Sequence, residues 1–195
     1  MITDRWVAVK RKTGETEVEV QLKLRGEGKG RIDTGIGFFN HMLENFAKHS
    51  GVDLFITARG DLEVDFHHTV EDVGIVLGQA LAQALYPLQN VERFANVVAI
   101  LDEAAVEVDL DLGGRPYLVY DLPIDGKIGE FDGELGEEFF KSLAFNGRFA
   151  LHLIYKRGKN RHHILESAFK GFGVALRRAL YYREGVGVPS TKGVL

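Results

Sequence analysis

The chain has 195 residues, of which 45% are hydrophobic, and it carries a formal net charge of −4 and no cysteine. This size and hydrophobic content suit one compact domain or two small, closely packed halves. The lack of cysteine excludes disulfides, thiolate ligands and a cysteine nucleophile, so any metal must be held by His, Asp or Glu. Without a long apolar run, a signal peptide or a basic tract, we expect a soluble cytoplasmic protein that binds neither membrane nor nucleic acid.

The first half of the sequence predicts strands followed by interleaved helices. Period-2 alternation of apolar and polar residues indicates half-buried strands, and the glycines at 26, 28 and 30 predict a flexible turn. Apolar residues at helical spacing from Val70 to Ala84 indicate a helix with one buried face. The expected elements are strands over 4–11, 15–25, 52–60 and 61–65 and helices over 37–50 and 67–85.

The second half predicts a closely similar series. Its expected elements are strands over 96–102, 104–112, 116–121 and 149–156 and helices over 132–146 and 162–181. Strands and helices are mixed rather than strictly alternating, which favours an α+β fold with antiparallel sheet over a doubly wound fold.

The two halves repeat one another in sequence. The alternating segment 18–24 (VEVQLKL) is echoed by 106–112 (VEVDLDL), and the helix from His67 matches the helix from His162 at several glycine, alanine and leucine positions. We therefore predict two structural repeats within one compact unit, followed by a short tail. The predicted segments are 1–90, 91–185 and 186–195.

A His-His-x-x-Glu motif occurs once in each half. Because a helix turns about 100° per residue, the first His and the Glu share a face and can chelate one ion, while the second His points elsewhere. Two copies thus indicate half-sites for two ions, each drawing ligands from both copies, whereas a single copy would be more typical of a polar helix start. The motif residues are His67, His68 and Glu71, and His162, His163 and Glu166.

The helix that precedes each motif is the expected source of further ligands. His41 precedes the first motif, and Glu138 holds the related place before the second. Nitrogen ligands with one or two carboxylates fit a divalent first-row ion of catalytic type, a description that Mn, Fe, Co, Ni and Zn all satisfy.

Several separated motifs carry a resemblance to a known family. They are the run GIGFFNHML at 35–43, both His-His-x-x-Glu motifs, ESAFK at 166–170 and the tail PSTKGVL at 189–195. Together they resemble the imidazoleglycerol-phosphate dehydratase family over nearly the whole chain.

The resemblance implies a fold, an activity and an assembly. The fold would be a duplicated ribosomal protein S5 domain 2-like unit, in which each repeat has a small sheet and two helices. The activity would be dehydration of D-erythro-imidazole glycerol phosphate to imidazole acetol phosphate and water in L-histidine biosynthesis, with two Mn²⁺ ions in each active site. The family assembles as a homo-oligomeric shell of 24 subunits, with sites between neighbouring chains.

The family pattern also divides the ligands between the ions. One Mn²⁺ would be held by His41, His68, His162 and Glu166, and the other by His67, Glu71, His163 and the residue at 138. Family members typically have His where this chain has Glu138, and a glutamate can ligate Mn²⁺ through oxygen.

The chemistry and the resemblance together suggest roles for further residues. Our hypothesis is that the substrate imidazole binds both ions as an imidazolate, expels the hydroxyl and passes through a diazafulvene-like state. Glu15, otherwise an ordinary turn residue, matches the family's substrate-contacting glutamate and is the candidate general acid or base. His152 is expected to be structural. The residues implied to bind the substrate and its phosphate are His49, Arg93, Arg115, Lys170, Ser190, Thr191 and Lys192.

Two other functions fit the same residues. One is a different dimetal enzyme, such as a hydrolase, and the other is a non-catalytic metal-binding scaffold, which the departure at Glu138 keeps open. Release of free phosphate from a phosphate ester would indicate the hydrolase, and metal binding without turnover would indicate the scaffold.

Overall fold

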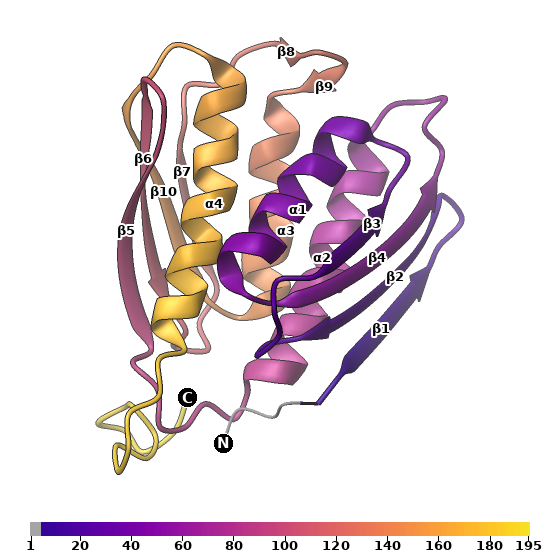
Figure 1. Cartoon of the computed structure of the whole chain (residues 1–195). Coiled ribbons are helices and arrows are strands. Elements are labelled where there is room, and N and C mark those ends of the chain that lie inside the picture. Colours follow the sequence, from indigo (N-terminus) through magenta and orange to yellow (C-terminus); the bar gives the residue numbers. More distant parts are fainter. Residues whose placement is uncertain (1–4) are drawn as a thin grey trace.

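The computed structural model describes residues 5–195 and shows four helices layered between two four-stranded sheets (Figure 1). The sheets cover opposite sides of the helical layer, and the chain runs through one sheet with its helices before it enters the other. No helix within residues 5–195 is both long and apolar enough to cross a membrane.

The two halves contain the same series of six main elements. The first series is β1 (Val7–Lys12), β2 (Thr16–Lys23), β3 (Gly30–Asp33), α1 (Gly37–Ser50), β4 (Asp53–Gly60) and α2 (His67–Leu85). The second is β5 (Phe94–Leu101), β6 (Ala104–Asp111), β7 (Tyr117–Asp121), α3 (Glu134–Gly147), β10 (Ala150–Arg157) and α4 (Arg161–Ala179). A small hairpin of β8 (Lys127–Ile128) and β9 (Phe131–Asp132) lies only in the second half.

The two sheets also share one topology. Their strand orders are β1-β2-β4-β3 and β5-β6-β10-β7. In each sheet three strands pair antiparallel, and the third strand of the repeat joins the edge in parallel, as β3 on β4 and β7 on β10. This confirms the predicted duplicated α+β fold. The predicted boundaries near 90 and 185 fall between α2 and β5 and after α4, and the division into 1–90, 91–185 and 186–195 remains a prediction.

Most predicted elements are present, with small shifts at their ends. Helices α1 and α2 begin and end where the sequence predicted, and α3 and α4 differ by one or two residues. The predicted strand over 4–11 is β1, which begins at Val7, and position 4 lies outside the described residues. Strands β3, β8 and β9 were not predicted, because they are too short to show a periodic pattern, and Gly30, assigned to the turn, begins β3.

The predicted strand over 61–65 is wrong, because this segment forms a turn. The main-chain N–H of Val64 donates to the carbonyl of Asp61 at 2.8 Å. Strand β4 pairs with β3 as far as Thr57 and with β2 as far as Gly60, after which the chain must reverse its direction to enter α2. Residues beyond Gly60 therefore have no strand to pair with, although their side chains alternate.

The helices pack as two parallel pairs that join the repeats. Glycines allow the close approach in both pairs. A Cβ on Gly74 would lie 2.9 Å from the Phe139 carbonyl oxygen, and one on Gly78 would lie 2.7 Å from the Leu143 carbonyl oxygen, which places α2 against α3. A Cβ on Gly173 would lie 2.9 Å from the Phe46 carbonyl oxygen, which places α4 against α1. Each motif helix therefore starts beside the first turns of a helix from the other repeat.

Phenylalanine rings fill the space between the helix pairs. Phe139 of α3 stacks on Phe169 of α4 with centroids 5.1 Å apart and meets Phe39 of α1 edge-on at 5.2 Å. Phe46 of α1 stacks on Phe172 of α4 at 5.1 Å. These rings are almost fully buried, so the two repeats share one core.

We predict that Gly78→Ala destabilises the protein by about 1–3 kcal/mol, because the new methyl group must push α2 away from the backbone of α3. The expected gain in helix propensity, about 1 kcal/mol, does not offset this overpacking. Chemical denaturation followed by circular dichroism measures the change. Gly37→Ala, in α1 with no atom within 4 Å of its Cβ position, is the control and should be neutral or stabilising. A Gly78→Ala protein as stable as the unmodified chain would contradict the close packing.

Candidate metal centre

The first turns of α1 and α4 bring three predicted metal ligands together. One ligand atom each from His41, His162 and Glu166 lies within 4.8 Å of the other two. Glu166 Oε2 is 2.9 Å from His162 Nε2 and 3.4 Å from His41 Nε2. Two imidazole nitrogens and one carboxylate oxygen form a donor set that suits a divalent first-row metal.

Helix geometry explains this cluster. His162 and Glu166 stand four residues apart on one face of α4. The Asn160 side chain caps this helix by accepting the main-chain N–H of His162 at 3.0 Å. His41 joins them because α1 runs parallel to α4, which brings the two helix starts together.

Glu166 is held as an anion beside a cation. Its side chain is 9% exposed, and Oε1 lies 2.5 Å from Lys170 Nζ, one turn further along α4. Burial alone would raise the pKa of Glu166, but hydrogen bonds from Lys170 and His162 outweigh burial and leave the pKa below its ordinary value. The carboxylate is therefore ionised at neutral pH, as a metal ligand must be.

The repeat-related residues Glu138, His67 and Glu71 lie at the starts of α3 and α2. Among residues 5–195 they do not form a cluster as tight as the one between α1 and α4. The Glu138 carboxylate faces Lys141 of its own helix at 3.5 Å, and its side chain is 23% exposed. Nevertheless, α2 packs on α3 in parallel, in the same way as α4 packs on α1. The three residues therefore lie at the helix starts of their pair, as the first cluster does in the other pair.

The second histidine of each motif bonds a carboxylate outside its own helix. Its ring lies 6.1 Å from the ring of the first histidine and is nearly perpendicular to it, at 87° in the first motif and 81° in the second. His68 Nδ1 lies 2.9 Å from Asp61 Oδ2, and this hydrogen bond raises the pKa of His68. His163 Nδ1 lies 2.8 Å from Glu103 Oε2. Each ring therefore has one nitrogen occupied by a carboxylate.

Glu15 lies at the tip of the β1–β2 hairpin beside His68. Its Oε1 is 3.8 Å from His68 Nε2, and its side chain is 57% exposed. The hairpin is fastened to α2 by Asp72, which accepts hydrogen bonds from Thr16 Oγ1 and, at 2.8 Å, from Arg11 Nε. The predicted acid or base thus comes close to a predicted metal ligand on a fixed support.

Sequence reasoning missed the carboxylates that support the site. Asp72 follows Glu71 directly in the motif helix, and its burial is a signal only the structure provides. The repeat in the sequence could have identified Glu103. It lies three residues before Val106, just as Glu15 lies three residues before the matching Val18. The hydrogen bond from His163, together with main-chain N–H groups, lowers the pKa of Glu103 to about 2. Asp61 was assigned to the strand predicted over 61–65.

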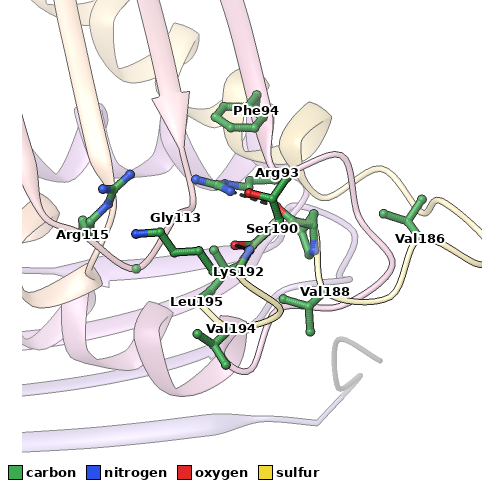
Figure 2. Close-up of a pocket in the computed structure, with 13 residues that line it drawn as sticks. Arg93, Phe94, Gly113, Arg115, Val186, Val188, Ser190, Lys192, Val194 and Leu195 are labelled. Atoms are coloured by element: carbon green, nitrogen blue, oxygen red, sulfur yellow. Dashed lines mark hydrogen bonds between the residues drawn. The ribbon is translucent and has the colours of Figure 1, made fainter.

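A cavity of about 720 Å³ beside the C-terminal tail gathers most of the predicted phosphate-binding residues. Figure 2 shows the nitrogen-bearing ends of Arg93, Arg115 and Lys192 turned toward a common space, with Ser190 beside them. Thr191 also lines this cavity. Three cationic groups and two hydroxyls around one space form a suitable environment for an anion.

Arg93 fastens the tail to the second sheet. Its Nε and Nη2 donate to the two oxygens of Asp111 at 2.7 and 3.0 Å, and its Nη1 donates to the Pro189 carbonyl at 2.9 Å. The side chain is 12% exposed, so these bonds are partly shielded from water. Arg93 therefore supports the cavity as well as lining it.

The other implied substrate-binding residues lie outside this cavity. Lys170 pairs with Glu166 at the metal cluster. His49 lies in the last turn of α1, where burial, followed by the charges of Lys170 and Arg177, lowers the pKa of its ring. His152, expected to be structural, lies on β10 with its ring 6.4 Å from the ring of Tyr117.

These features define a class of protein: a duplicated α+β fold with a group of histidine and carboxylate side chains suited to a metal ion between its repeats and a cavity lined by cationic side chains at its tail. Comparison with known proteins narrows the class. The model of the imidazoleglycerol-phosphate dehydratase family matches residues 34–176.

Relatives and solved structures agree with this match. Imidazoleglycerol-phosphate dehydratase of Nautilia profundicola is 67% identical to this chain, and the alignment covers 96% of this chain and 98% of the relative. The enzyme of a Sulfurovum species is 57% identical, and the alignment covers 97% of this chain and 100% of that relative. The crystal structure of the Staphylococcus aureus enzyme superposes with a TM-score of 0.83 at 36% identity, covering 91% of this chain and 99% of that one. The crystal structure of the Pyrococcus furiosus enzyme, solved in complex with (S)-C348, also superposes with a TM-score of 0.83. It is 41% identical, and the match covers 96% of this chain and 100% of that one.

The chain belongs to the imidazoleglycerol-phosphate dehydratase family. It is thus a hydro-lyase of histidine biosynthesis, and the family's use of metal agrees with the cluster between α1 and α4.

We predict that Arg93→Ala releases the C-terminal tail, because it removes the side-chain bond to Pro189 and leaves Asp111 without its partner. Hydrogen exchange of residues 186–195 should quicken by about tenfold or more, as loss of a charge-assisted hydrogen bond implies. Arg183→Ala, which breaks an exposed ion pair with Glu92, is the matched control and should change little. Unchanged exchange in Arg93→Ala would mean that the tail is held by other contacts.

Proposed function

We propose that the chain catalyses the Mn²⁺-dependent dehydration of D-erythro-imidazole glycerol phosphate to imidazole acetol phosphate and water, with two ions in each active site. The observation that best supports this is the cluster of His41, His162 and Glu166, because its donors suit a first-row divalent ion. Family membership supports the choice of substrate. We also propose that the enzyme works in the cytoplasm.

The reaction is difficult without assistance. A hydrogen must leave a carbon that no carbonyl activates, and a hydroxyl must leave the neighbouring carbon. When bound at these ligands, the two Mn²⁺ ions would supply Lewis acidity to the substrate imidazole. The residues of the chain must bind and orient the substrate and move its protons.

The ligand arrangement supports sites shared between chains. His41, His162 and Glu166 supply three ligands from one chain, and we assign the fourth to His68 of a neighbouring copy. The second ion takes Glu138, His67 and Glu71 from one chain and His163 from another. His68 and His163 fit this role because each uses Nδ1 to bond a carboxylate, which leaves Nε2 for a metal ion. Sharing of this kind accounts for a homo-oligomer, which we propose has 24 subunits.

Glu138 gives the second site two carboxylates. To ligate an ion, the Glu138 carboxylate must turn away from Lys141. The two groups are 3.5 Å apart and partly exposed, so their ion pair is weak and a metal ion can replace Lys141 as the partner of the carboxylate. Oxygen ligands are well suited to Mn²⁺. We therefore include Glu138 among the ligands.

Glu15 is the proposed general acid or base. Its carboxylate lies 3.8 Å from His68 Nε2, so it would stand beside the ion that His68 binds. It is exposed and can therefore exchange a proton with the substrate or with water, while Asp72 fixes the hairpin that carries it. A carboxylate in this place can take the proton from carbon and protonate the departing hydroxyl.

The tail cavity is the proposed phosphate site. Arg115, Ser190, Thr191 and Lys192 offer charge and hydroxyl donors there, and Arg93 holds the tail in place. Lys170 and His49 lie on the helix pair of the metal cluster, and we assign them to the substrate region next to the ion.

The direct test is conversion of imidazole glycerol phosphate by the chelator-stripped protein with and without added Mn²⁺. We expect turnover only with metal, detected as formation of imidazole acetol phosphate. Free phosphate as the product would instead indicate a hydrolase. A folded, metal-loaded protein without turnover would indicate a binding scaffold.

We predict that Glu15→Gln lowers kcat about 10²- to 10⁴-fold while Mn²⁺ binding stays intact, because the amide cannot transfer a proton. Steady-state kinetics and metal analysis measure the two effects. Glu17→Gln, two residues along the same hairpin and paired with Lys12 at the surface, is the matched control and should turn over normally. Normal turnover by Glu15→Gln would remove Glu15 from the proton-transfer step.

A further inference from the structure

The duplication places one glutamate on the first hairpin of each repeat. Glu15 lies between β1 and β2, three residues before Val18, and Glu103 lies between β5 and β6, three residues before Val106. Each glutamate approaches the second histidine of the motif helix in its own repeat, Glu15 at His68 and Glu103 at His163. The two are counterparts in sequence and in place.

Their contacts differ, however, in a way that indicates different roles. Glu103 Oε1 accepts the main-chain N–H groups of Lys159 at 3.0 Å and Asn160 at 2.8 Å, and its Oε2 lies 2.8 Å from His163 Nδ1. Both carboxylate oxygens are thus engaged. Glu15, by contrast, stands 3.8 Å from the Nε2 of His68, which is beyond hydrogen-bond distance.

The contact with Glu103 fixes which nitrogen of His163 is free. An ionised carboxylate can only accept, so Nδ1 carries the proton and Nε2 of the neutral ring keeps its lone pair. That Nε2 lies 3.9 Å from the exposed Asp102 carboxylate, too far for a hydrogen bond. In the first repeat Asp61 makes the same bond to Nδ1 of His68. Asp61 follows β4, whereas Glu103 comes from a hairpin, so the repeats reach one arrangement from different segments.

Glu103 also contacts the segment that leads into α4. Lys159 and Asn160 form the approach to this helix, and Asn160 is its N-cap. By holding both main-chain N–H groups, the Glu103 carboxylate ties the helix start, with His162 and His163, to the β5–β6 hairpin.

We propose that Glu103 is a positioning residue that orients His163 and fixes its tautomer, so that Nε2 is presented to the second metal ion. This inference rests on the proposed dimetal function. Carboxylates that hold the outer nitrogen of a metal-bound histidine commonly strengthen metal binding 10- to 100-fold.

The test is Mn²⁺ binding by the full-length protein, measured by equilibrium dialysis with metal analysis. The unmodified chain should bind two ions. Glu103→Ala should weaken one of the two sites 10- to 100-fold and leave the other near its original affinity. Glu103→Gln should restore only part of the loss, because its single amide oxygen can accept from Nδ1 while its NH2 group then faces the main-chain N–H groups of Lys159 and Asn160.

Asn160→Ala is the matched control for damage to the helix start. It removes the side-chain cap on His162 but keeps the main-chain N–H that Glu103 accepts. We expect it to lower the melting temperature while both ions still bind. Full binding of both ions by Glu103→Ala, or equal loss from both sites as in a frayed helix, would overturn the positioning role. Fewer than two ions on the unmodified chain would instead overturn the dimetal function on which it rests.

Discussion

The close parallel packing of each motif helix on a helix from the other repeat is the constraint on which the rest of the molecule depends. Gly74 and Gly78 let α2 approach α3, and Gly173 lets α4 approach α1. Because the pairs are parallel, the starts of two helices from different repeats meet, and polar side chains on their first turns share one space. The cluster of His41, His162 and Glu166 arises in this way, and neither repeat could form it alone.

Duplication then allowed the two copies to diverge without loss of the framework. The sheets keep one topology, yet the position of His41 in α1 is taken by Glu138 in α3, and the hairpin glutamates have different contacts. Glu15 remains exposed, whereas Glu103 is bound by three hydrogen bonds. One scaffold thus carries an exposed glutamate in one repeat, which we propose as the acid or base, and a hydrogen-bonded glutamate in the other.

The sequence correctly predicted the elements whose residues follow a regular local pattern. Helices α1 and α2 were placed correctly because their apolar spacing is regular, and the duplication predicted two matching sheets. Strand β3 was missed because its 4 residues are too few to show a periodic pattern. The turn at 61–64 was missed because strand pairing, which ends β4 at Gly60, decides the conformation of this segment. The supporting roles of Asp61 and Asp72 depend likewise on contacts that only the folded chain creates.

The most direct test of paired sites built between the repeats is a crystal structure of the Mn²⁺-loaded protein with anomalous diffraction at the manganese edge. We predict two peaks per chain, one bonded to His41, His162 and Glu166 and the other to His67, Glu71 and Glu138. A single peak, with Glu138 still paired to Lys141, would contradict the proposal that both helix pairs bind metal.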